Sequence, residues 1–575
     1  MKYAANVRST GQVALPPVRA RVLLLLMFAA MVALMVRAIY LQGIHTEFLQ
    51  QEGNARYGRV VDIIAHRGMI ADRAGNPLAI STPVESIWAS PPDVEATPQQ
   101  VRQLAQVLGM DVSDVSKRLQ EKREFVYLKR QLSPELAAQA MKLGIPGLAM
   151  RHEYRRYYPS GEVTSHILGF TDVDDNGQEG VEFGWQATLG GKNGSQRVIK
   201  DRRGYIVEDG ASIRPPKPGV DVALSLDSKI QFLAFRELKA AVEQHHAKNG
   251  SIVVLDARSG EVLALANWPS YNPNNRDKPN VTLLRNHAVT DLFEPGSTMK
   301  PFTIATALDN GMVKPNTVIN TRGGTFTVGG RTIHDTHPEN ALTVAQVIQK
   351  SSNVGAAKIA LMLPAKNFWT GLSDAGFGEP TGSGFPGEAL GKLRDYRKWR
   401  PIEQATMSYG NGISVNLLQL ARAYTVFAND GEMKPISLLK QDVPQLGQPV
   451  FSPSTARAVR DMLELVVKPG GTAPLAQVQG YRVAGKTGTA HKLENGHYVD
   501  HYVASFVGLA PASNPRLIVA VMVNDPAGRE YYGGQVAAPV FSSVMGQALR
   551  LLNVPNDAPL NNVLQPPAEI VKEDA

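Results

Sequence analysis

The sequence predicts an α+β fold: an antiparallel sheet flanked by helices in a large C-terminal domain, preceded by a mixed domain and one N-terminal transmembrane helix. Three observations predict this order. An uncharged apolar run, Val22–Val36, stands near the N-terminus. A proline cluster, Pro215–Gly219, divides the rest of the chain, and strand-like runs stand at both ends of a long helical stretch beyond it. With 575 residues, the chain is too long for one core, which rarely exceeds roughly 250–300 residues.

The first predicted element is a membrane anchor over residues 22–41. A span needs about 20 residues, and the apolar run reaches that length at Leu41 if Arg37 extends to the headgroups. Four basic residues and no acidic residue precede the run, so residues 1–21 are expected in the cytoplasm and everything after Leu41 outside. A cleaved signal peptide is the alternative, but no small-residue cleavage site follows the run. The basic flank argues against a buried core helix.

Residues 42–219 are predicted to form one extracytoplasmic domain that contains short strands and at least one helix. The run Val60–Ile64 is strand-like, and Gly and Asn-Pro turn signals interrupt such runs. Thr97–Leu108 is amphipathic and places Pro98 in the first helical turn. The dense prolines of Pro215–Gly219 hold the chain extended, which indicates a linker at the domain boundary.

Residues 220–552 are predicted to be the α+β domain, and 553–575 a disordered tail that is rich in Pro and Asn and ends acidic. The strands of this domain are expected to form one largely antiparallel sheet that the helices cover. The predicted elements are a helix at Ser228–Gln244, a hairpin of Ser251–Leu255 and Val262–Ala266, a helical middle at Lys300–Ala428, strands at Tyr481–Ala484, Val503–Leu509 and Leu517–Val523, and a closing helix at Ala537–Leu552.

Composition excludes several classes of function. The net charge is only +8, and Lys and Arg are scattered rather than gathered in a stripe, so nucleic-acid binding has no support. The absence of cysteine excludes disulfides, thiolate metal sites and a cysteine nucleophile. The sequence also lacks a phosphate-binding loop and the His-Glu-x-x-His pattern or other close spacing of metal ligands, so a phosphate-loop enzyme and a zinc hydrolase have no support.

Three short motifs carry the chemistry. They are Ser-Thr-Met-Lys at 297–300, Ser-Ser-Asn at 351–353 and Lys-Thr-Gly at 486–488. Each motif alone is weak, because Ser-x-x-Lys arises by chance in long chains, Ser-Ser-Asn is an ordinary helix cap and Lys-Thr-Gly suits a solvated turn. Together and in this order, they match the signature of penicillin-binding proteins and class A β-lactamases.

The first motif predicts a nucleophile and its base. Pro301 is tolerated only in the first turn of a helix, so Ser297 is expected at a helix N-terminus, where the dipole favours developing negative charge. Lys300 follows three residues later and shares a face with Ser297. A serine needs a nearby base, and a buried lysine close to a second cation, here Lys486, loses its proton more readily. Ser297 is the predicted nucleophile and Lys300 the predicted general base.

The second motif is predicted to serve proton transfer. Ser351 is expected to pass a proton between Lys300 and a leaving amine. Asn353 is expected to orient Lys300 and to hydrogen-bond a substrate amide.

The third motif is predicted to bind substrate at the end of a strand. The ammonium of Lys486 and the hydroxyls of Thr487 and Thr489 are expected to bind a substrate carboxylate. Gly488 is expected to leave room for a substrate backbone along the strand. The backbone N–H groups of Ser297 and Thr489 are the predicted oxyanion hole.

With these residues, the chain resembles the class B penicillin-binding proteins, closest to the division-specific peptidoglycan D,D-transpeptidase of Gram-negative bacteria. His287 and Asn411 depart from the residues that are usual in division members, and neither belongs to the acylation motifs. The matching segments are His66–Arg73 with Gly75, Leu78 and Ala79, Arg156–Pro159 with Gly161, Gly180–Glu182 with Leu189, Arg285–Phe302, Lys486–Pro511 and Tyr531–Phe541.

The resemblance implies a transpeptidase domain of the penicillin-binding and serine β-lactamase type on an elongated pedestal. It implies that Ser297 attacks the penultimate D-Ala carbonyl of a peptidoglycan stem peptide, releases D-Ala and passes the acyl group to an amine of a neighbouring stem. β-Lactam antibiotics mimic D-Ala-D-Ala and would acylate the same serine. The implied partners are a polytopic division glycan polymerase and other division membrane proteins, and no metal or organic cofactor is implied. The implied location is the bacterial inner membrane, with the catalytic domain in the periplasm.

Three alternatives remain open from the sequence. An elongation-specific class B transpeptidase has the same chemistry in another complex. A β-lactamase or carboxypeptidase would need a group that activates a deacylating water, and none of Glu379, Glu388 and Glu403 is identifiable as that group from the sequence. A catalytically silent scaffold is disfavoured by the intact motifs. A β-lactam sensor is disfavoured by the short segment before the anchor, because sensors usually have more spans and a cytoplasmic effector.

Overall fold

The computed structural model describes residues 16–46, 48, 58–200, 206–275, 280–494 and 496–563. The chain divides into two compact units. The first contains residues 1–64, 84–153 and 193–217, and the second contains residues 65–83, 154–192 and 218–575. Segments 65–83 and 154–192 therefore pack with C-terminal residues, although the sequence predicted that they belong to a domain that ends at Gly219.

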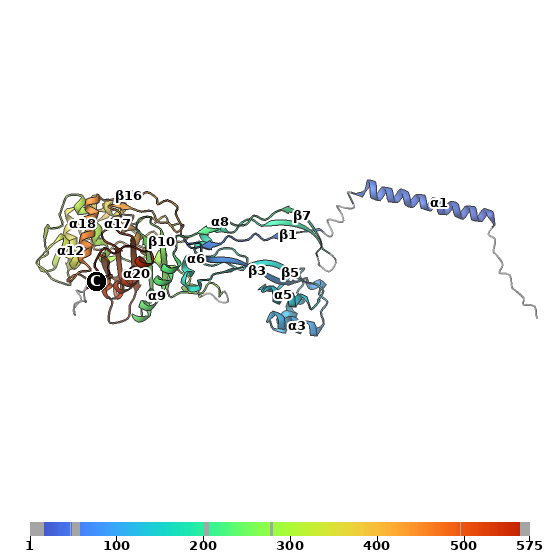
Figure 1. The fold of residues 1–575 in the computed structure, drawn as a ribbon, viewed down its shortest axis with the longest axis horizontal. Helices are drawn as coiled ribbons and strands as arrows, with labels where there is room; N and C mark the ends of the chain where they lie inside the picture. The colour runs from blue at the N-terminus through green and yellow to red at the C-terminus, as the bar shows by residue number, and fades with distance from the viewer. Residues whose placement is uncertain are drawn as a thin grey trace, which may run out of the picture. The chain divides into compact units, whose positions relative to one another are not determined.

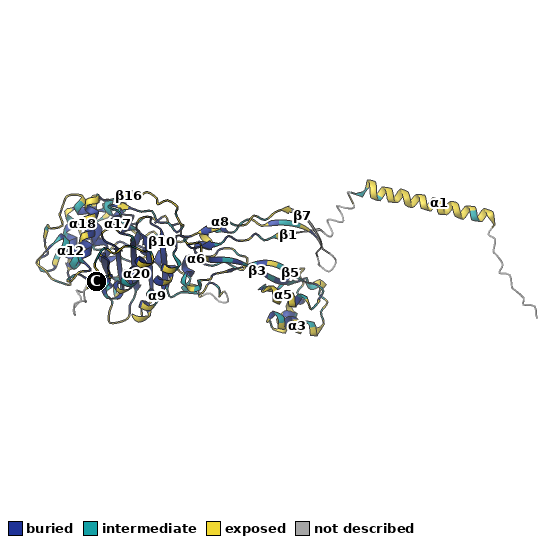
Figure 2. Cartoon of the chain, in the orientation of Figure 1, coloured by how far each residue is buried: buried dark blue, intermediate teal, exposed yellow. Residues whose placement is uncertain are grey.

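The predicted anchor segment is one long helix. α1 spans Pro17–Ile39 and continues as a π-helical turn, η1, over Tyr40–Ile44. None of its residues is buried, and Figure 2 shows exposed residues along its length. Within the described residues, it is the one helix long and apolar enough to cross a membrane. The helix begins before the predicted Val22 because Pro17 suits the first helical position, where an N–H would have no partner.

The rest of the first unit combines a small helical cluster with a three-stranded antiparallel sheet of order β1-β6-β7. The helix predicted at Thr97–Leu108 is confirmed as α3, which begins one residue later, at Pro98, because Thr97 and Gln100 cap each other's backbone N–H groups. Leu104 and Leu108 of α3 pack into a core of their own. The elements are β1 (Gly58–Ile63), η2 (Pro91–Asp93), α3 (Pro98–Leu108), α4 (Val112–Leu119), β4 (Val126–Leu132), α5 (Pro134–Met141), β6 (Gly194–Lys200) and β7 (Ile206–Arg214), with β3 (Pro77–Ala89) and β5 (Leu148–Tyr157) contributing residues to both units.

A five-stranded antiparallel sheet of order β10-β9-β19-β18-β17 forms the centre of the second unit. Every residue of β9 is buried. The hairpin that the sequence predicts is confirmed as β9 and β10, and the predicted closing strands lie within β18 and β19. β17 is the edge strand, so one side of it is not paired within the sheet. The bounds are β9 (Asn249–Asp256), β10 (Val262–Trp268), β17 (Ala484–Glu494), β18 (His497–Ala510) and β19 (Leu517–Asn524).

Helices cover both faces of this sheet, as Figure 1 shows for α9 and α20 on one face. α9 (Ser228–Gln244) and α20 (Ala538–Leu551) lie on the face of Phe506, whose ring meets that of Phe541 in α20 at 4.7 Å. Ser505 points to the opposite face, because successive strand residues alternate. There the Ser505 hydroxyl donates to the Gly488 carbonyl at 3.2 Å, beside the loop that carries Ser297.

The sequence predicted one helical stretch over Lys300–Ala428. This part of the chain is mostly helical, but it contains four short strands that the sequence did not predict. Their short, partly exposed pairs carry too little apolar pattern to stand out in the sequence. The elements are α11 (Lys300–Asp309), β11 (Val318–Asn320), β12 (Thr325–Val328), β13 (Arg331–His334), β14 (Ala341–Thr343), α12 (Val344–Lys350), α13 (Asn353–Met362), α14 (Ala365–Asp374), η6 (Tyr396–Lys398), α15 (Pro401–Met407), α16 (Leu417–Ala423) and α17 (Thr425–Ala428).

The remaining elements of the second unit are mostly short. They are β2 (Ile70–Ala71), η3 (Gly161–Val163), α6 (Ser165–Leu168), α7 (Gly180–Gly184), α8 (Gln186–Leu189), β8 (Val222–Ala223), η4 (Val281–Leu283), α10 (His287–Thr290), η5 (Gly296–Met299), β15 (Glu432–Met433), β16 (Gln448–Pro449), α18 (Pro453–Leu465), η7 (Pro474–Ala476) and α19 (Gly533–Val536).

Both ends of the predicted C-terminal domain are more tightly bound than the sequence indicates. Gly219, the last residue of the predicted linker, donates its N–H to the His66 carbonyl at 2.9 Å, and a Cβ there would lie 1.7 Å from the Leu189 carbonyl oxygen. At the other end, residues 553–563 bind the segment 478–482. Asn562 donates to the carbonyls of Val478 and Tyr481 at 3.1 and 3.0 Å. The prediction of a disordered tail is therefore wrong for residues 553–563. Residues 564–575, the rest of the predicted tail, lie outside the described residues.

Candidate active site

The backbone around Ser297 is built as predicted, with one tight turn before the helix. η5 (Gly296–Met299) leads directly into α11, and Pro301 stands in the first turn of α11. The Thr298 hydroxyl donates to the Pro295 carbonyl at 2.7 Å, and the Tyr424 hydroxyl donates to the Thr298 carbonyl at 2.9 Å. These bonds fix the turn from both sides, so Ser297 is held at the N-terminal end of a buried helix, only 2% exposed.

The predicted nucleophile and base are in contact. Lys300 Nζ donates to Ser297 Oγ at 2.8 Å and to Ser351 Oγ at 3.1 Å, and it also bonds the Ser351 carbonyl. Lys486 Nζ donates to the same Ser351 Oγ at 2.9 Å. Lys300, Ser351 and Lys486 are fully buried. The hydroxyl of Ser351 therefore connects the Nζ atoms of two buried lysines in a line that ends at Ser297.

Ser351 has a left-handed backbone, with φ +61°, which is unusual for a residue with a side chain. It ends α12, and Ser352 then caps α13 by accepting from the Gly355 N–H at 2.9 Å. Asp335 anchors this turn, because its carboxylate accepts from the Ser352 hydroxyl at 2.6 Å and from the Val354 N–H at 2.8 Å. The strained conformation of Ser351 is thus held by neighbours on both sides and aims its hydroxyl between the two lysines.

The third motif lies inside a strand rather than at the end of one, which corrects the sequence-based placement. β17 begins at Ala484, and Lys486–Gly488 are its third to fifth residues. The predicted strand Tyr481–Ala484 is wrong except for its last residue, because Tyr481 and Arg482 bind the C-terminal segment instead. The motif side chains therefore project from a paired, rigid strand next to η5.

The two threonines of β17 have partners of their own. The Thr487 and Thr472 hydroxyls are hydrogen-bonded at 2.8 Å, and Lys486 Nζ donates to Thr487 Oγ1 at 3.1 Å. Thr489 Oγ1 accepts from the Gly533 N–H at 3.0 Å. These bonds fix the direction of each hydroxyl along the edge of the sheet.

Gly488 has a structural reason in addition to the predicted room for a substrate backbone. A Cβ on Gly488 would lie 2.5 Å from Ser505 Oγ and 2.9 Å from the Pro295 carbonyl oxygen. The glycine thus lets β17 approach the loop that carries Ser297. Gly296 lies beside Thr489 across the same junction, where a Cβ would stand 3.4 Å from the Thr489 carbonyl oxygen. This close packing brings the predicted oxyanion-hole donors, the N–H groups of Ser297 and Thr489, to neighbouring backbones.

Asn353 is less well placed for its predicted orienting role. Its side-chain amide donates to the His334 carbonyl at a long 3.5 Å. Three other residues support the site without any motif signal: Thr472, Asp335 and Tyr424. Their contacts join positions at least 15 residues apart in the chain, so no local spacing could reveal them.

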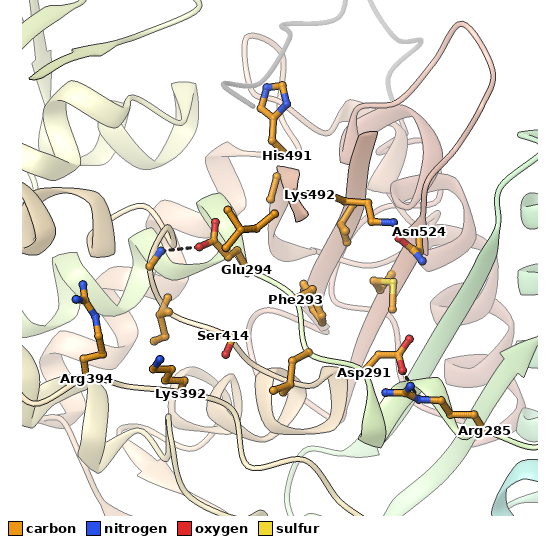
Figure 3. Close-up of a pocket in the computed structure, with 17 residues that line it drawn as sticks. Arg285, Asp291, Phe293, Glu294, Lys392, Arg394, Ser414, His491, Lys492 and Asn524 are labelled. Carbon is orange, nitrogen blue, oxygen red and sulfur yellow. Dashed lines mark hydrogen bonds and ion pairs between the residues drawn. The ribbon is translucent and has the colours of Figure 1, made fainter. Parts of the chain in front are cut away.

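A cavity of about 690 Å³ lies beside the nucleophile loop (Figure 3). Glu294, three residues before Ser297, lines it and accepts from the Gly412 N–H at 2.8 Å and from the Tyr498 hydroxyl at 3.0 Å. Burial raises the pKa of the Glu294 carboxyl, and the two hydrogen bonds offset that rise only in part. In the described part of the chain, no three His, Asp or Glu side chains gather where they could hold a metal ion.

Two protein families match the chain, one before and one within the part that contains the three motifs. The penicillin-binding protein dimerisation domain family matches residues 62–224. The penicillin binding protein transpeptidase domain family matches residues 250–546, more than half of the chain, and this range contains all three motifs.

Relatives with these domains align over nearly the full length. A probable peptidoglycan D,D-transpeptidase PenA of Neisseria meningitidis serogroup A is 44% identical over 93% of this chain and 92% of its own length. The peptidoglycan D,D-transpeptidase FtsI of Escherichia coli K12 is 43% identical over 92% and 91%. Among solved structures, the apo transpeptidase domain of penicillin-binding protein 3 from Burkholderia pseudomallei has a TM-score of 0.54 and 50% identity, and it covers 58% of this chain and 98% of that structure. A peptidoglycan glycosyltransferase from Burkholderia ambifaria has a TM-score of 0.53 and 52% identity over 58% and 99%.

Proposed function

The chain belongs to the penicillin-binding protein transpeptidase family, and from this premise we propose that it is a peptidoglycan D,D-transpeptidase that cross-links stem peptides at the division septum. One observation carries the proposal: Ser297, Lys300, Ser351 and Lys486 form a continuous, buried line of hydrogen bonds. A serine nucleophile needs such a base in contact with it. The septal assignment follows from the named FtsI and PenA relatives.

Acylation is the first half of the reaction. Lys300, as a free amine, takes the proton of Ser297 Oγ while that oxygen bonds the carbonyl carbon of the penultimate D-Ala. The Ser297 and Thr489 N–H groups stabilise the negative oxygen of the tetrahedral intermediate. The bond from carbon to the terminal D-Ala nitrogen then breaks, and that nitrogen receives a proton through Ser351 from the lysines. D-Ala leaves, and an ester on Ser297 remains.

Transfer to the acceptor is the second half. A primary amine of a neighbouring stem attacks the ester carbonyl and gives up a proton to the Lys300 and Ser351 pair. The ester bond breaks, Ser297 Oγ regains a proton, and a new peptide bond joins the two stems. Before acylation, Lys486, Thr487 and Thr489 bind the carboxylate of the terminal D-Ala, which leaves with that residue. In both halves, Asn353 contacts a donor amide and Gly488 admits the donor backbone along the free edge of β17.

The same site accounts for β-lactam binding. A β-lactam presents a strained amide in place of the D-Ala-D-Ala bond, so Ser297 opens the ring by the same attack. The leaving group stays covalently attached, which blocks the approach of the acceptor amine. We therefore propose that β-lactams acylate Ser297 and leave it only slowly.

The membrane arrangement and partners form part of the proposal. Residues 1–21 lie in the cytoplasm, residues 22–41 span the bacterial inner membrane once, and the pedestal and transpeptidase domains, 42–219 and 220–552, lie in the periplasm. The helical character of α1 and the absence of buried residues in it support this arrangement. The partners are a polytopic glycan polymerase and other membrane proteins of the division machinery, which the anchor and pedestal contact.

The test is covalent labelling of the detergent-solubilised full chain with a fluorescent penicillin. Wild type is compared with Ser297→Ala, and intact mass is followed for hours after a chase. A stable adduct on Ser297, absent from the variant, is expected. An adduct lost within seconds would assign a β-lactamase instead, and a folded wild type without any adduct would refute the acyl-enzyme.

A further inference from the structure

The segment that follows α20, residues 553–563, lies against the turn 478–482 that leads into β17. It comes after the range that the transpeptidase family matches. Gly480 shows how close this contact is, because its φ is +85° and a Cβ there would lie 3.0 Å from Asn556 Cγ. The Gly480 carbonyl also accepts from the Ala558 N–H at 3.1 Å. Residues 553–563 thus cover the turn, and we call them the C-terminal strap.

Two polar side chains hold the strap in place. Asp557 accepts from the Arg482 N–H at 2.7 Å with one carboxylate oxygen, and from the N–H and hydroxyl of Ser513 at 3.2 and 2.7 Å with the other. Asn562 accepts from the Gly480 N–H at 2.9 Å and donates to two carbonyls of the turn. The strap therefore supplies partners to backbone groups that the turn does not pair by itself.

Arg482 connects the turn to α18. Its guanidinium pairs with the buried carboxylate of Glu464 on that helix, with Nε 3.1 Å from Oε2. The chain after α18 leads to Thr472, whose hydroxyl lies 2.8 Å from that of Thr487. Thr487 also follows Arg482 closely in the sequence, inside β17. The turn therefore supports Thr487 by two routes, through β17 itself and through α18 and Thr472.

A cavity of about 260 Å³ lies beside this turn. Its walls include Tyr481 and Arg482 from the turn, Glu464 from α18, and Ala558 and Asn562 from the strap. Because the turn borders this space, side-chain packing does not hold it on that side. The hydrogen bonds of the strap hold it instead, and without them the turn can shift into the cavity.

We propose that Asp557 and Asn562 are positioning residues of the transpeptidase site. They fix the turn 478–482, and the turn keeps the Thr487 hydroxyl in place for the carboxylate of the terminal D-Ala or of a β-lactam. This inference rests on the proposed function, in which Thr487 helps to bind that carboxylate. It extends the site to a segment beyond the three motifs.

The experiment compares acylation by benzylpenicillin and by its methyl ester, which lacks the carboxylate. Both second-order rate constants are measured on the same full chain in detergent, and their ratio reports the carboxylate contact. An unfolded fraction or a general defect at Ser297 lowers both constants alike and cancels in the ratio. The variants are Asp557→Ala and Asn562→Ala. Asn561→Ala, at an exposed neighbour, is the matched control, and Thr487→Val is the reference for a lost contact.

The wild type should favour benzylpenicillin over the ester, and Thr487→Val should reduce that ratio about 10- to 100-fold, since a hydrogen bond to a charged group is lost. Asp557→Ala and Asn562→Ala should each reduce it at least about threefold, because the contact is weakened rather than removed. Asn561→Ala should keep the wild-type ratio.

A reduced ratio in Thr487→Val, with wild-type ratios in Asp557→Ala and Asn562→Ala, would overturn the positioning role alone. A wild type that acylates equally fast with the acid and the ester would overturn both carboxylate binding at Thr487 and the role of the strap. A wild type that penicillin does not acylate would overturn the proposed transpeptidase itself, and the positioning role with it.

Discussion

Lys300 Nζ lies 2.8 Å from Ser297 Oγ, with both side chains buried at the start of α11. The two residues are three apart in the sequence, and the turn of η5 places them on one face of the helix start. The base is therefore in position before any substrate binds, and the remaining requirement is that Lys300 is a free amine when Ser297 attacks.

Lys300→Ala should remove acylation while the protein stays folded. The alanine fits the space of a buried side chain, but Ser297 loses the base in contact with it. A general base contributes about 100- to 10,000-fold to a rate, so second-order acylation by a fluorescent penicillin should fall by that factor. Lys366→Ala, an exposed lysine on α14, is the control and should label at the wild-type rate. Normal labelling of Lys300→Ala would refute the general-base role.

Gly410→Ala should slow acylation through packing alone. Its Cβ would clash with the Gly296 carbonyl at 2.1 Å, and its φ of +91° is unfavourable for alanine. We expect a loss of about 1–3 kcal/mol in unfolding free energy, as for other overpacked sites, together with slower penicillin labelling.

Gly330→Ala is the matched control for Gly410→Ala. Its φ is +76°, but nothing lies within 4 Å of a Cβ there. Gly330→Ala should lower the unfolding free energy through its unfavourable φ alone, and penicillin should label it at the wild-type rate. If both glycine variants labelled equally, the contact between Gly410 and Gly296 would not position the nucleophile.

Glu182→Gln should destabilise the second unit strongly. Glu182 is fully buried and accepts from Arg67 Nε at 2.7 Å and from Arg156 Nε at 2.6 Å. Without its charge, two buried guanidinium groups lose their counter-ion, and breaking a buried pair costs about 3–5 kcal/mol. Chemical denaturation followed by fluorescence measures this loss.

The control for Glu182→Gln is Asp395→Asn, which removes the carboxylate of a surface pair with Arg397, whose side chain is 75% exposed. A surface pair contributes about 0–1 kcal/mol. Similar losses in the two variants would show that the buried network around Glu182 is no more important than a surface pair.

His166 should make the stability of the second unit depend on pH. Burial lowers the pKa of His166 from 6.5 to about 4, while its hydrogen bond to the Leu283 carbonyl opposes this shift. The unfolded chain therefore binds a proton at a higher pH than the folded one. The contribution of neutral His166 to the unfolding free energy is therefore complete above pH 6.5. It is lost as the pH falls toward 4, by about 3 kcal/mol in total.

The measurement is the unfolding free energy of wild type and His166→Gln at several values between pH 7 and 4. Glutamine keeps an N–H donor for Leu283 but has no titrating group. The difference between the two proteins should shrink or change sign as the pH falls. A constant difference over this range would contradict a buried, neutral His166.

The sequence alone determined the local features of the site. Pro301 dictated where α11 begins, since a proline without an N–H fits only the first turn, and the three-residue spacing then placed Lys300 beside Ser297. The helix that begins at Pro98 and the hairpin of β9 and β10 were predictable for the same reason. Each depends on backbone preferences and apolar periods within a few residues.

Only the tertiary structure decided which distant groups complete the site. Distant segments meet where Ser351 lies between Lys300 and Lys486, where Thr472 and Asp335 support the motifs, and where Glu294 binds Gly412 and Tyr498. No local pattern encodes such contacts, because they form only when the helices and the sheet pack. The prolines before Gly219 predicted an extended segment for the same local reason. They could not predict the hydrogen bond from the Gly219 N–H to the His66 carbonyl, because His66 lies far away in the chain.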